Sequence, residues 1–357
     1  MIISRTPFRI SFFGGGTDYP AWYRQHGGAV LAVTINKYCY LTCRYLPPFL
    51  EHRIRVVYAK IELCHRIDEI VHPSVRETLR YLKIDRGVEI HHNADLPGRS
   101  GMGSSSAFTV GLLHGLYALK GCAIGKKQLA TESIHLEQEI LKETVGSQDQ
   151  VCAAYGGLNR VNFLSNGDFA VQPMTLSRER LEELNSHLML FYTGIKRTAS
   201  EVASSYAASM SERAALLAKM HEYVDQSCVI LNSTQGLDAF GELLHQAWLA
   251  KRALSDKVSN PHVDGLYDDA RAAGAVSGKL LGAGGGGFVL LFVPPARQAA
   301  VRQRLNRLIQ VPFKFEFSGS QIIFYDLEED FSEHDRERAR QQIESFRELN
   351  PDSPLAS

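Results

Sequence analysis

The sequence predicts an α+β protein built from two domains. The chain has 357 residues, more than a single domain of ordinary size contains. Strand-like and helix-like segments come in groups rather than in strict alternation, which favours α+β over a parallel doubly wound sheet. The composition changes at a polar segment rich in arginine and glutamate, 172–186. We therefore expect an N-terminal domain at 1–185, a C-terminal domain at 186–345 and a tail at 346–357.

The overall composition narrows the classes of partner. Hydrophobic residues make up 45% and charged residues 22%, as in a globular protein with a core. A formal net charge of +0 argues against nucleic acid held by bulk electrostatics. The N-terminus lacks an apolar signal core, and the longest mostly apolar stretch, 280–295, is too short to span a bilayer. We expect a cytoplasmic protein without a membrane partner, whose six scattered cysteines are free thiols.

The first strand is predicted to lead into a tight turn. Apolar residues at 8, 10 and 12 alternate with Arg9 and Ser11, as in a half-buried strand, and Gly14, Gly15 and Gly16 follow. Arg9 then points toward whatever the glycine turn encloses. Taken alone, the segment favours a surface arginine before a flexible turn.

The remaining elements follow from periodicity and turn signals. Helical patterns occupy 71–82, 104–119 and 127–142, three stretches between 200 and 273, and a charged tail at 331–349. Strand patterns occupy 29–35, 37–45, 161–163, 169–171, 188–193, 288–293 and 322–325. The segment Ser165-Asn166-Gly167 predicts a hairpin between two of these strands.

The glycine- and serine-rich segment at 97–107 is the most informative. Its glycines let backbone N–H groups approach an anion, and its serines stand where the helix at 104–119 begins. Phosphate binds well at such a helix N-terminus, and serine hydroxyls there can reach a phosphate-bound Mg²⁺. The alternative is a glycine-rich turn with an ordinary serine cap.

A further glycine-rich segment, 281–288, formally contains G-x-G-x-x-G. A dinucleotide site needs that motif before a helix, and here a strand follows, so an oxidoreductase is a weak reading. The nearby segment 274–279 lacks the spacing of a Walker motif. A glycine-rich bend packed under a site is the simpler interpretation.

Two stretches carry candidate carboxylates. Glu137 and Glu139 flank the apolar stripe of the helix at 127–142 on opposite sides, and periodicity does not choose between them. Asp149 stands among small polar residues before an apolar run, which suits an acid that lines a cleft. The alternative for Asp149 is a helix N-cap.

In this order the segments resemble the GHMP kinase superfamily, which includes galactokinase and mevalonate kinase. The stretches 6–18, 145–150 and 191–194 are similar to its branch acting on D-glycero-D-manno-heptose 7-phosphate. That resemblance implies transfer of phosphate from ATP to the anomeric hydroxyl, on the route to nucleotide-activated heptose for surface polysaccharide. A fucokinase-type or other hexose kinase is the main alternative, and a non-catalytic sugar-binding protein is a further one.

The resemblance also implies a fold and residue roles. We expect an N-terminal domain like ribosomal protein S5 domain 2 and a ferredoxin-like C-terminal domain. Asp149 is the expected catalytic residue with Arg9 beside it, and Mg²⁺ is expected on Ser105 and Glu137. The ATP phosphates are expected on Gly101, Met102, Gly103, Ser104, Ser105 and Ser106. The sugar or sugar phosphate is expected on Gly14, Gly15, Gly16, Thr17, Asp18, Gly284, Gly285 and Arg197. Either a monomer or a homodimer is compatible with the sequence.

The triple glycine departs from galactokinase, which has larger polar residues between the strand and the aspartate. Its lack of side chains should make room for a bulkier sugar or let N–H groups bind a sugar phosphate. On this hypothesis Gly15→Glu changes the sugar preference.

Overall fold

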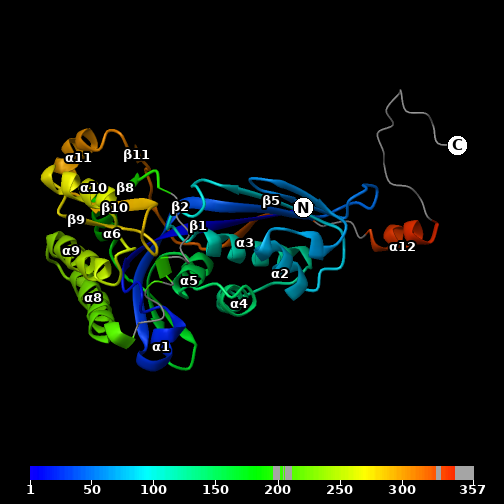
Figure 1. The fold of residues 1–357 in the computed structure, drawn as a ribbon, viewed down its shortest axis with the longest axis horizontal. Helices are drawn as coiled ribbons and strands as arrows, with labels where there is room; N and C mark the ends of the chain where they lie inside the picture. The colour runs from blue at the N-terminus through cyan, green and yellow to red at the C-terminus, as the bar shows by residue number, and fades with distance from the viewer. Residues whose placement is uncertain (196–201, 204, 206–210, 327–330, 342–357) are drawn as a thin grey trace.

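The computed structural model describes residues 1–195, 202–203, 205, 211–326 and 331–341. Two sheets with flanking helices make up this part of the chain, and nearly all strand pairs are antiparallel, which confirms the α+β class. The larger sheet extends away from the smaller one, which lies with α8 and α9 at one end of the molecule (Figure 1).

The larger sheet has the order β13-β1-β2-β5-β3-β4, with β6, β7 and β12 attached through β2. Its long central strand β2 pairs with β1 along one edge and with both β6 and β5 along the other. Only the pair of β3 and β5 is parallel among the described strands. The strands are β1 (Ile2–Phe13), β2 (Gly28–Tyr45), β3 (Ile54–Val57), β4 (Ile61–Cys64), β5 (Val88–Ala94), β6 (Leu158–Phe163), β7 (Phe169–Pro173), β12 (Phe315–Glu316) and β13 (Gln321–Tyr325).

Helices α2 to α5 lie together on one face of this sheet (Figure 1). The central one, α3, keeps the predicted bounds, and its buried apolar residues pack on β1 and β2. The helical elements here are α1 (Pro20–His26), η1 (Ile67–Glu69), α2 (Pro73–Tyr81), α3 (Ser104–Leu119), α4 (Lys126–His135), the π-turn η2 (Leu136–Ile140) and α5 (Gln148–Tyr155).

The smaller sheet has the order β11-β8-β10-β9 and is antiparallel throughout. Its strands are β8 (Leu188–Tyr192), β9 (Ser277–Leu280), β10 (Phe288–Phe292) and β11 (Ile309–Gln310). The helical elements of this half and the tail are α6 (Arg178–Ser186), η3 (Ser211–Arg213), α8 (Ala214–Asn232), α9 (Asp238–Arg252), α10 (Pro261–Ala272), η4 (Pro295–Arg297), α11 (Gln298–Arg304) and α12 (Ser332–Gln341). No described helix combines the length and apolarity needed to cross a membrane.

Three predicted features differ in the structure. Strand β1 is buried on both faces rather than half-buried, because α3 covers one face and Phe240 of α9 packs against Phe12 and Phe13. The segments 29–35 and 37–45 form one continuous strand. The chain also returns to the larger sheet through β12 and β13, so residues 315–325 do not extend a C-terminal unit that runs from 186 to 345.

The two sheets meet where β1 ends. Lys279 of β9 donates to the backbone oxygen of Phe12 over 2.7 Å. Helix α8 packs against the glycine turn that follows, with Leu217 beside Gly16 and Val224 beside Gly14. The glycine-rich segments therefore lie at the junction of the two sheets, where a site can draw on both halves.

Candidate active site

The centre of the candidate site is an ion pair between β1 and α5. Arg9 Nε and Nη2 donate to Asp149 Oδ1 and Oδ2 over 2.8 and 2.9 Å. Arg9 is buried, whereas the side chain of Asp149 stays 25% exposed. Asp149 lies in the first turn of α5, and the N-cap position belongs to Ser147. A bidentate pair fixes both side chains and leaves the carboxylate open to a ligand.

The phosphate-loop candidate, residues 101–106, lies directly against this pair. Arg9 Nη1 donates to the carbonyl oxygen of Gly101 over 2.7 Å. Gly103 is the N-cap of α3 with φ of 72°, and a Cβ there would lie 3.4 Å from the Asp149 carboxyl group. Met102 is buried, so the loop presents backbone rather than a side chain at that position. The unpaired N–H groups that begin α3 therefore open next to Asp149.

The expected metal residues are partly rearranged. Glu137 is fully buried and Glu139 is exposed, so the structure selects the residue that the resemblance favoured. The serine that contacts Glu137 is Ser106, whose hydroxyl donates over 2.9 Å, and Ser105 is exposed. Consecutive helical positions point about 100° apart, so Ser106 rather than Ser105 contacts Glu137 here. The expected metal role of Ser105 stays a prediction.

Glu137 occupies the π-turn η2, which buries the consecutive residues Leu136 and Glu137 together. Its Oε2 accepts from Ser106 and Gln150, and its Oε1 has no hydrogen-bond partner among the described residues. Burial raises the pKa of Glu137 to about 7. An unsatisfied buried carboxylate oxygen beside a serine hydroxyl fits Mg²⁺, which takes one or two protein oxygens together with phosphate oxygens.

The glycine turn after β1 divides its residues into two roles. Thr17 is buried. Its hydroxyl lies 2.8 Å from the carbonyl oxygens of Gly14 and Ala29, and it can donate a hydrogen bond to either. A Cβ on Gly14 would lie 1.9 Å from Ala29 O, and one on Gly16 would press on Leu217. Only at Gly15 is there room, since the nearest atoms would be 3.8 and 3.9 Å away. Gly14 and Thr17 therefore build the turn instead of lining the site.

Asp18 is buried beside the ion pair. It accepts from Gly16 N and from Gln148 Nε2, both over 2.9 Å. Burial raises the pKa of Asp18, and the nearby charge of Asp149 adds to the effect. Gly146 permits this approach, because a Cβ there would lie 1.9 Å from Asp18 Oδ2. Asp18 and Asp149 thus reach the same region from the turn after β1 and from α5.

The third glycine-rich segment supports the phosphate loop through one residue. A Cβ on Gly282 would lie 2.5 Å from Gly101 Cα, so the two backbones are in direct contact. Gly284 and Gly285 pack instead against Val258, where Gly285 N donates to Val258 O over 2.9 Å. The predicted role of Gly284 and Gly285 in substrate binding is therefore not supported by their position. Arg197 lies outside the described residues.

Sequence reasoning missed two lysines and two glutamines of this region. Lys251 and Lys279 are buried near Arg9, and Gln148 and Gln150 hold the carboxylates of Asp18 and Glu137. The glutamines flank Asp149 in the sequence, so their position beside a candidate catalytic residue could have marked them as part of the site. The lysines stand more than 240 residues from Arg9 in the chain, and nothing local marks them.

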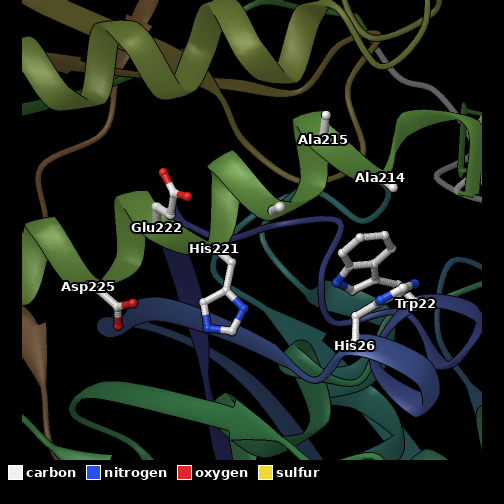
Figure 2. Close-up of a pocket in the computed structure, with 8 residues that line it drawn as sticks. Trp22, His26, Ala214, Ala215, His221, Glu222 and Asp225 are labelled. Atoms are coloured by element: carbon white, nitrogen blue, oxygen red, sulfur yellow. The ribbon is translucent and has the colours of Figure 1, made fainter.

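A separate pocket of about 390 Å³ opens between α1 and α8. Figure 2 shows Trp22 and His26 of α1 on one side and His221 and Glu222 of α8 on the other. The opposite face of α8 covers the glycine turn. None of the predicted site residues lines this pocket, so the candidate site is the junction itself.

Two family models match this chain. The model of the GHMP kinases N terminal domain matches residues 69–157, and that of the GHMP kinases C terminal domain matches residues 230–310. The first match contains residues 101–106, Glu137 and Asp149, and the second contains Lys251, Lys279 and Gly282.

Curated relatives are similar along most of this chain. The D-glycero-alpha-D-manno-heptose 7-phosphate kinase of Campylobacter jejuni is 28% identical over 330 residues, covering 86% of this chain and 93% of that protein. The bifunctional fucokinase/GDP-fucose pyrophosphorylase of Arabidopsis thaliana is 26% identical over 84% of this chain, which spans only 30% of that protein.

Solved structures share the fold. A D-glycero-D-manno-heptose 1-phosphate kinase from Bacteroides thetaiotaomicron superimposes with a TM-score of 0.74 at 24% identity, covering 91% of this chain and 100% of that one. A putative sugar kinase from Campylobacter jejuni gives a TM-score of 0.64 at 26% identity, with 90% and 98% covered. The predicted two-domain fold is confirmed, and the chain belongs to the GHMP kinase superfamily.

Proposed function

We propose that the chain is an ATP-dependent sugar kinase that phosphorylates the anomeric hydroxyl of D-glycero-D-manno-heptose 7-phosphate. The observation that carries the proposal is the Arg9–Asp149 pair, which touches Gly101 and Gly103 and lies beside Asp18. A phosphoryl donor on the loop and a hydroxyl acceptor at Asp18 then meet at Asp149. The heptose assignment rests on the similarity to the Campylobacter jejuni kinase.

Positioning and charge neutralisation account for most of the catalysis of phosphoryl transfer. In the proposed mechanism, the N–H groups of residues 101–106 hold the ATP phosphates at the start of α3. Asp149 accepts or orients the proton of the attacking sugar hydroxyl. Arg9 holds the Asp149 carboxylate in place and stabilises charge on the transferring group.

Glu137 and Ser106 are the residues proposed to hold Mg²⁺. A bound Mg²⁺ neutralises phosphate charge and orients the phosphates. Glu137 must give up its proton to bind the ion, which its pKa of about 7 allows near neutral pH. Gln150 keeps the Glu137 carboxylate in place meanwhile.

Asp18 and the backbone at Gly15 are proposed to hold the sugar. Asp18 is fixed in position by hydrogen bonds from Gln148 and from Gly16 N. We further propose a cytoplasmic location, where ATP is available, and a product that feeds nucleotide-activated heptose synthesis for surface polysaccharide. A fucokinase is the second candidate, because two relatives carry that name.

Release of ADP tests the proposal. The purified chain with Mg-ATP is offered heptose 7-phosphate, sedoheptulose 7-phosphate, mannose, fucose and galactose in separate reactions. We expect strong turnover with heptose 7-phosphate alone. Turnover with fucose instead keeps the kinase and removes the heptose assignment, whereas no turnover with any sugar contradicts the proposal.

A further inference from the structure

Two lysines are buried at the junction without a carboxylate partner. Lys251 of α9 is 6% exposed and Lys279 of β9 is 4% exposed. Within the described part of the chain neither ammonium forms an ion pair, and each has one hydrogen-bond acceptor, a backbone oxygen. Burial lowers the pKa of Lys251 to about 8 and lowers the pKa of Lys279 well below its usual range. An unpaired buried ammonium is unfavourable, so its retention calls for a function.

Hydrogen bonds place both lysines next to the candidate site. Lys251 Nζ donates to the carbonyl oxygen of Gly282, whose backbone touches Gly101. Gly101 O in turn accepts from Arg9. Lys279 Nζ donates to Phe12 O over 2.7 Å, two residues before the glycine turn begins. Lys251 thus reaches the junction from α9 on the side of the phosphate loop, and Lys279 reaches it from β9 at the end of β1.

Unused hydrogen-bond donors lie there. An ammonium has three N–H donors, so each lysine keeps two beyond its backbone bond. The hydroxyl of Ser11 is buried and has no partner among the described residues. Ser11 Oγ would lie 3.9 Å from a Cβ on Gly15, with Gln148 Nε2 at 3.8 Å on the other side. Two polar side chains therefore lie at ordinary contact distance from the position of a side chain at Gly15.

We infer that Lys251 and Lys279 form a subsite for a phosphate group already carried by the acceptor sugar, at the turn of Gly14, Gly15 and Gly16. This inference rests on the proposed function and narrows its acceptor to phosphorylated sugars. A dianion there pairs with both ammonium groups and compensates their burial. Because binding a phosphate favours the charged lysines, it also raises their protonation.

The geometry favours the acceptor's phosphate over a phosphate of ATP. The ATP phosphates have their own donors in the loop and at the start of α3. Lys279 is bonded to the strand that leads into the acceptor turn, not to the phosphate loop.

Calorimetric binding of a matched ligand pair tests the subsite. D-glycero-D-manno-heptose and its 7-phosphate are titrated into the wild-type chain and the variants Lys251→Met and Lys279→Met, with AMP-PNP and Mg²⁺ present. The wild type should bind the phosphate ester at least about tenfold more tightly. Each variant should lose about 10- to 100-fold in affinity for the ester, the range for a hydrogen bond to a charged group, and keep its affinity for the free sugar. Lys257→Met, an exposed lysine nearby, should change neither affinity.

Other outcomes contradict the subsite. Equal affinity of the wild type for the two ligands overturns it. An equal loss of affinity for both ligands in the lysine variants also overturns it, because that result indicates a structural role through Gly282 or Phe12. A loss in AMP-PNP affinity alone assigns the lysines to the nucleotide. Thermal unfolding checks the fold, since replacing an unpaired buried charge by an apolar side chain is neutral or stabilising. The experiment measures binding and not turnover. An absence of ADP release contradicts the proposed function, but the calorimetric affinities still test the phosphate subsite.

Discussion

Asp149 is the residue on which the proposed chemistry depends most. Asp149→Asn keeps the shape but removes the charge that receives the acceptor proton and pairs with Arg9. We predict a fall in turnover of about 100-fold or more, with nucleotide affinity within about threefold of the wild type. Steady-state ADP release and nucleotide titration measure the two quantities.

The matched control for Asp149→Asn is Asp168→Asn, which breaks the exposed Lys127–Asp168 ion pair and should leave turnover unchanged. The buried Arg9 loses its partner in Asp149→Asn, so rates are compared well below the unfolding temperature of that variant. Turnover at the wild-type level in Asp149→Asn removes Asp149 from the mechanism.

The raised pKa of Glu137 should make the free energy of unfolding depend on pH. Its folded pKa of about 7 lies above the ordinary 4.5, so the folded state holds the proton more tightly than the unfolded state. Stability from this residue is therefore greatest below pH 4.5 and falls as the pH rises through 7. Without Mg²⁺, the wild type should lose about 3 kcal/mol relative to Glu137→Gln between pH 4.5 and 8.

Urea unfolding across this pH range measures that difference. Glu139→Gln is the control, because Glu139 is exposed two residues away and its removal should leave the pH profile unchanged. Asp18, whose pKa is also raised, is present in all three proteins and cancels. Parallel profiles for the wild type and Glu137→Gln contradict a buried, protonated Glu137.

Individual residues show where sequence reasoning reaches its limit. Arg9 and Asp149 were predicted as a pair, and the structure brings them together. The contact of Ser106 with Glu137 was not predicted, because the rotation of α3 about its axis depends on how the helix packs. Lys251 and Lys279 were missed because burial and proximity across more than 240 residues leave no local pattern.

At the scale of elements, the contact between the two glycine-rich segments should control nucleotide binding. Gly282 and Gly121 both have φ of 71°, but only Gly282 touches another backbone, whereas a Cβ on Gly121 meets nothing within 4 Å. Gly121→Ala should cost about 1 to 2 kcal/mol for its backbone conformation alone. Gly282→Ala should cost more and raise the KM for ATP by about tenfold, because it separates residues 101 and 282.

Denaturant unfolding and ATP saturation curves compare the two alanine variants. Both variants carry the same backbone strain. The difference between their unfolding free energies, and between their KM values for ATP, therefore measures the effect of the contact between residues 101 and 282. If Gly282→Ala matches Gly121→Ala in both measurements, the third segment does not support the phosphate loop.

Elements with strong patterns were predicted well and short strands were not. The bounds of α3 match because an uninterrupted apolar pattern follows a glycine N-cap. Strands β3, β4 and β5 were not predicted, since their charged and histidine residues hide the alternation. The π-turn at Glu137 was also unforeseen, because a single widened turn has no signature in hydrophobic periodicity.

At the scale of the whole molecule, the return of the chain to the larger sheet should be required for its stability. Strand β13 covers the edge of β1, with Arg5 bonded to Gln321 over 2.7 Å and Thr6 to Ser320 over 2.9 Å. A chain ended after Val311 loses β12 and β13 and exposes that edge. We predict a loss of several kcal/mol, or failure to fold, relative to a chain ended after Gln341.

Soluble yield and denaturant unfolding of the two truncated chains test this requirement. Equal unfolding midpoints contradict it. The sequence indicated the last strand but not its partner, because pairing across more than 300 residues depends on topology rather than on local pattern. The grouping of strands and helices in the sequence predicted the fold class. It did not predict that β12 and β13 return to the larger sheet after the smaller sheet is complete.

The most direct test of the whole account is phosphorus NMR of a reaction containing the chain, Mg-ATP and heptose 7-phosphate. The account predicts one new phosphorus signal, coupled to the anomeric proton, which grows as the γ-phosphate signal of ATP disappears and is absent with Asp149→Asn. Inorganic phosphate as the only product, or an unchanged ATP spectrum, contradicts phosphoryl transfer to the sugar.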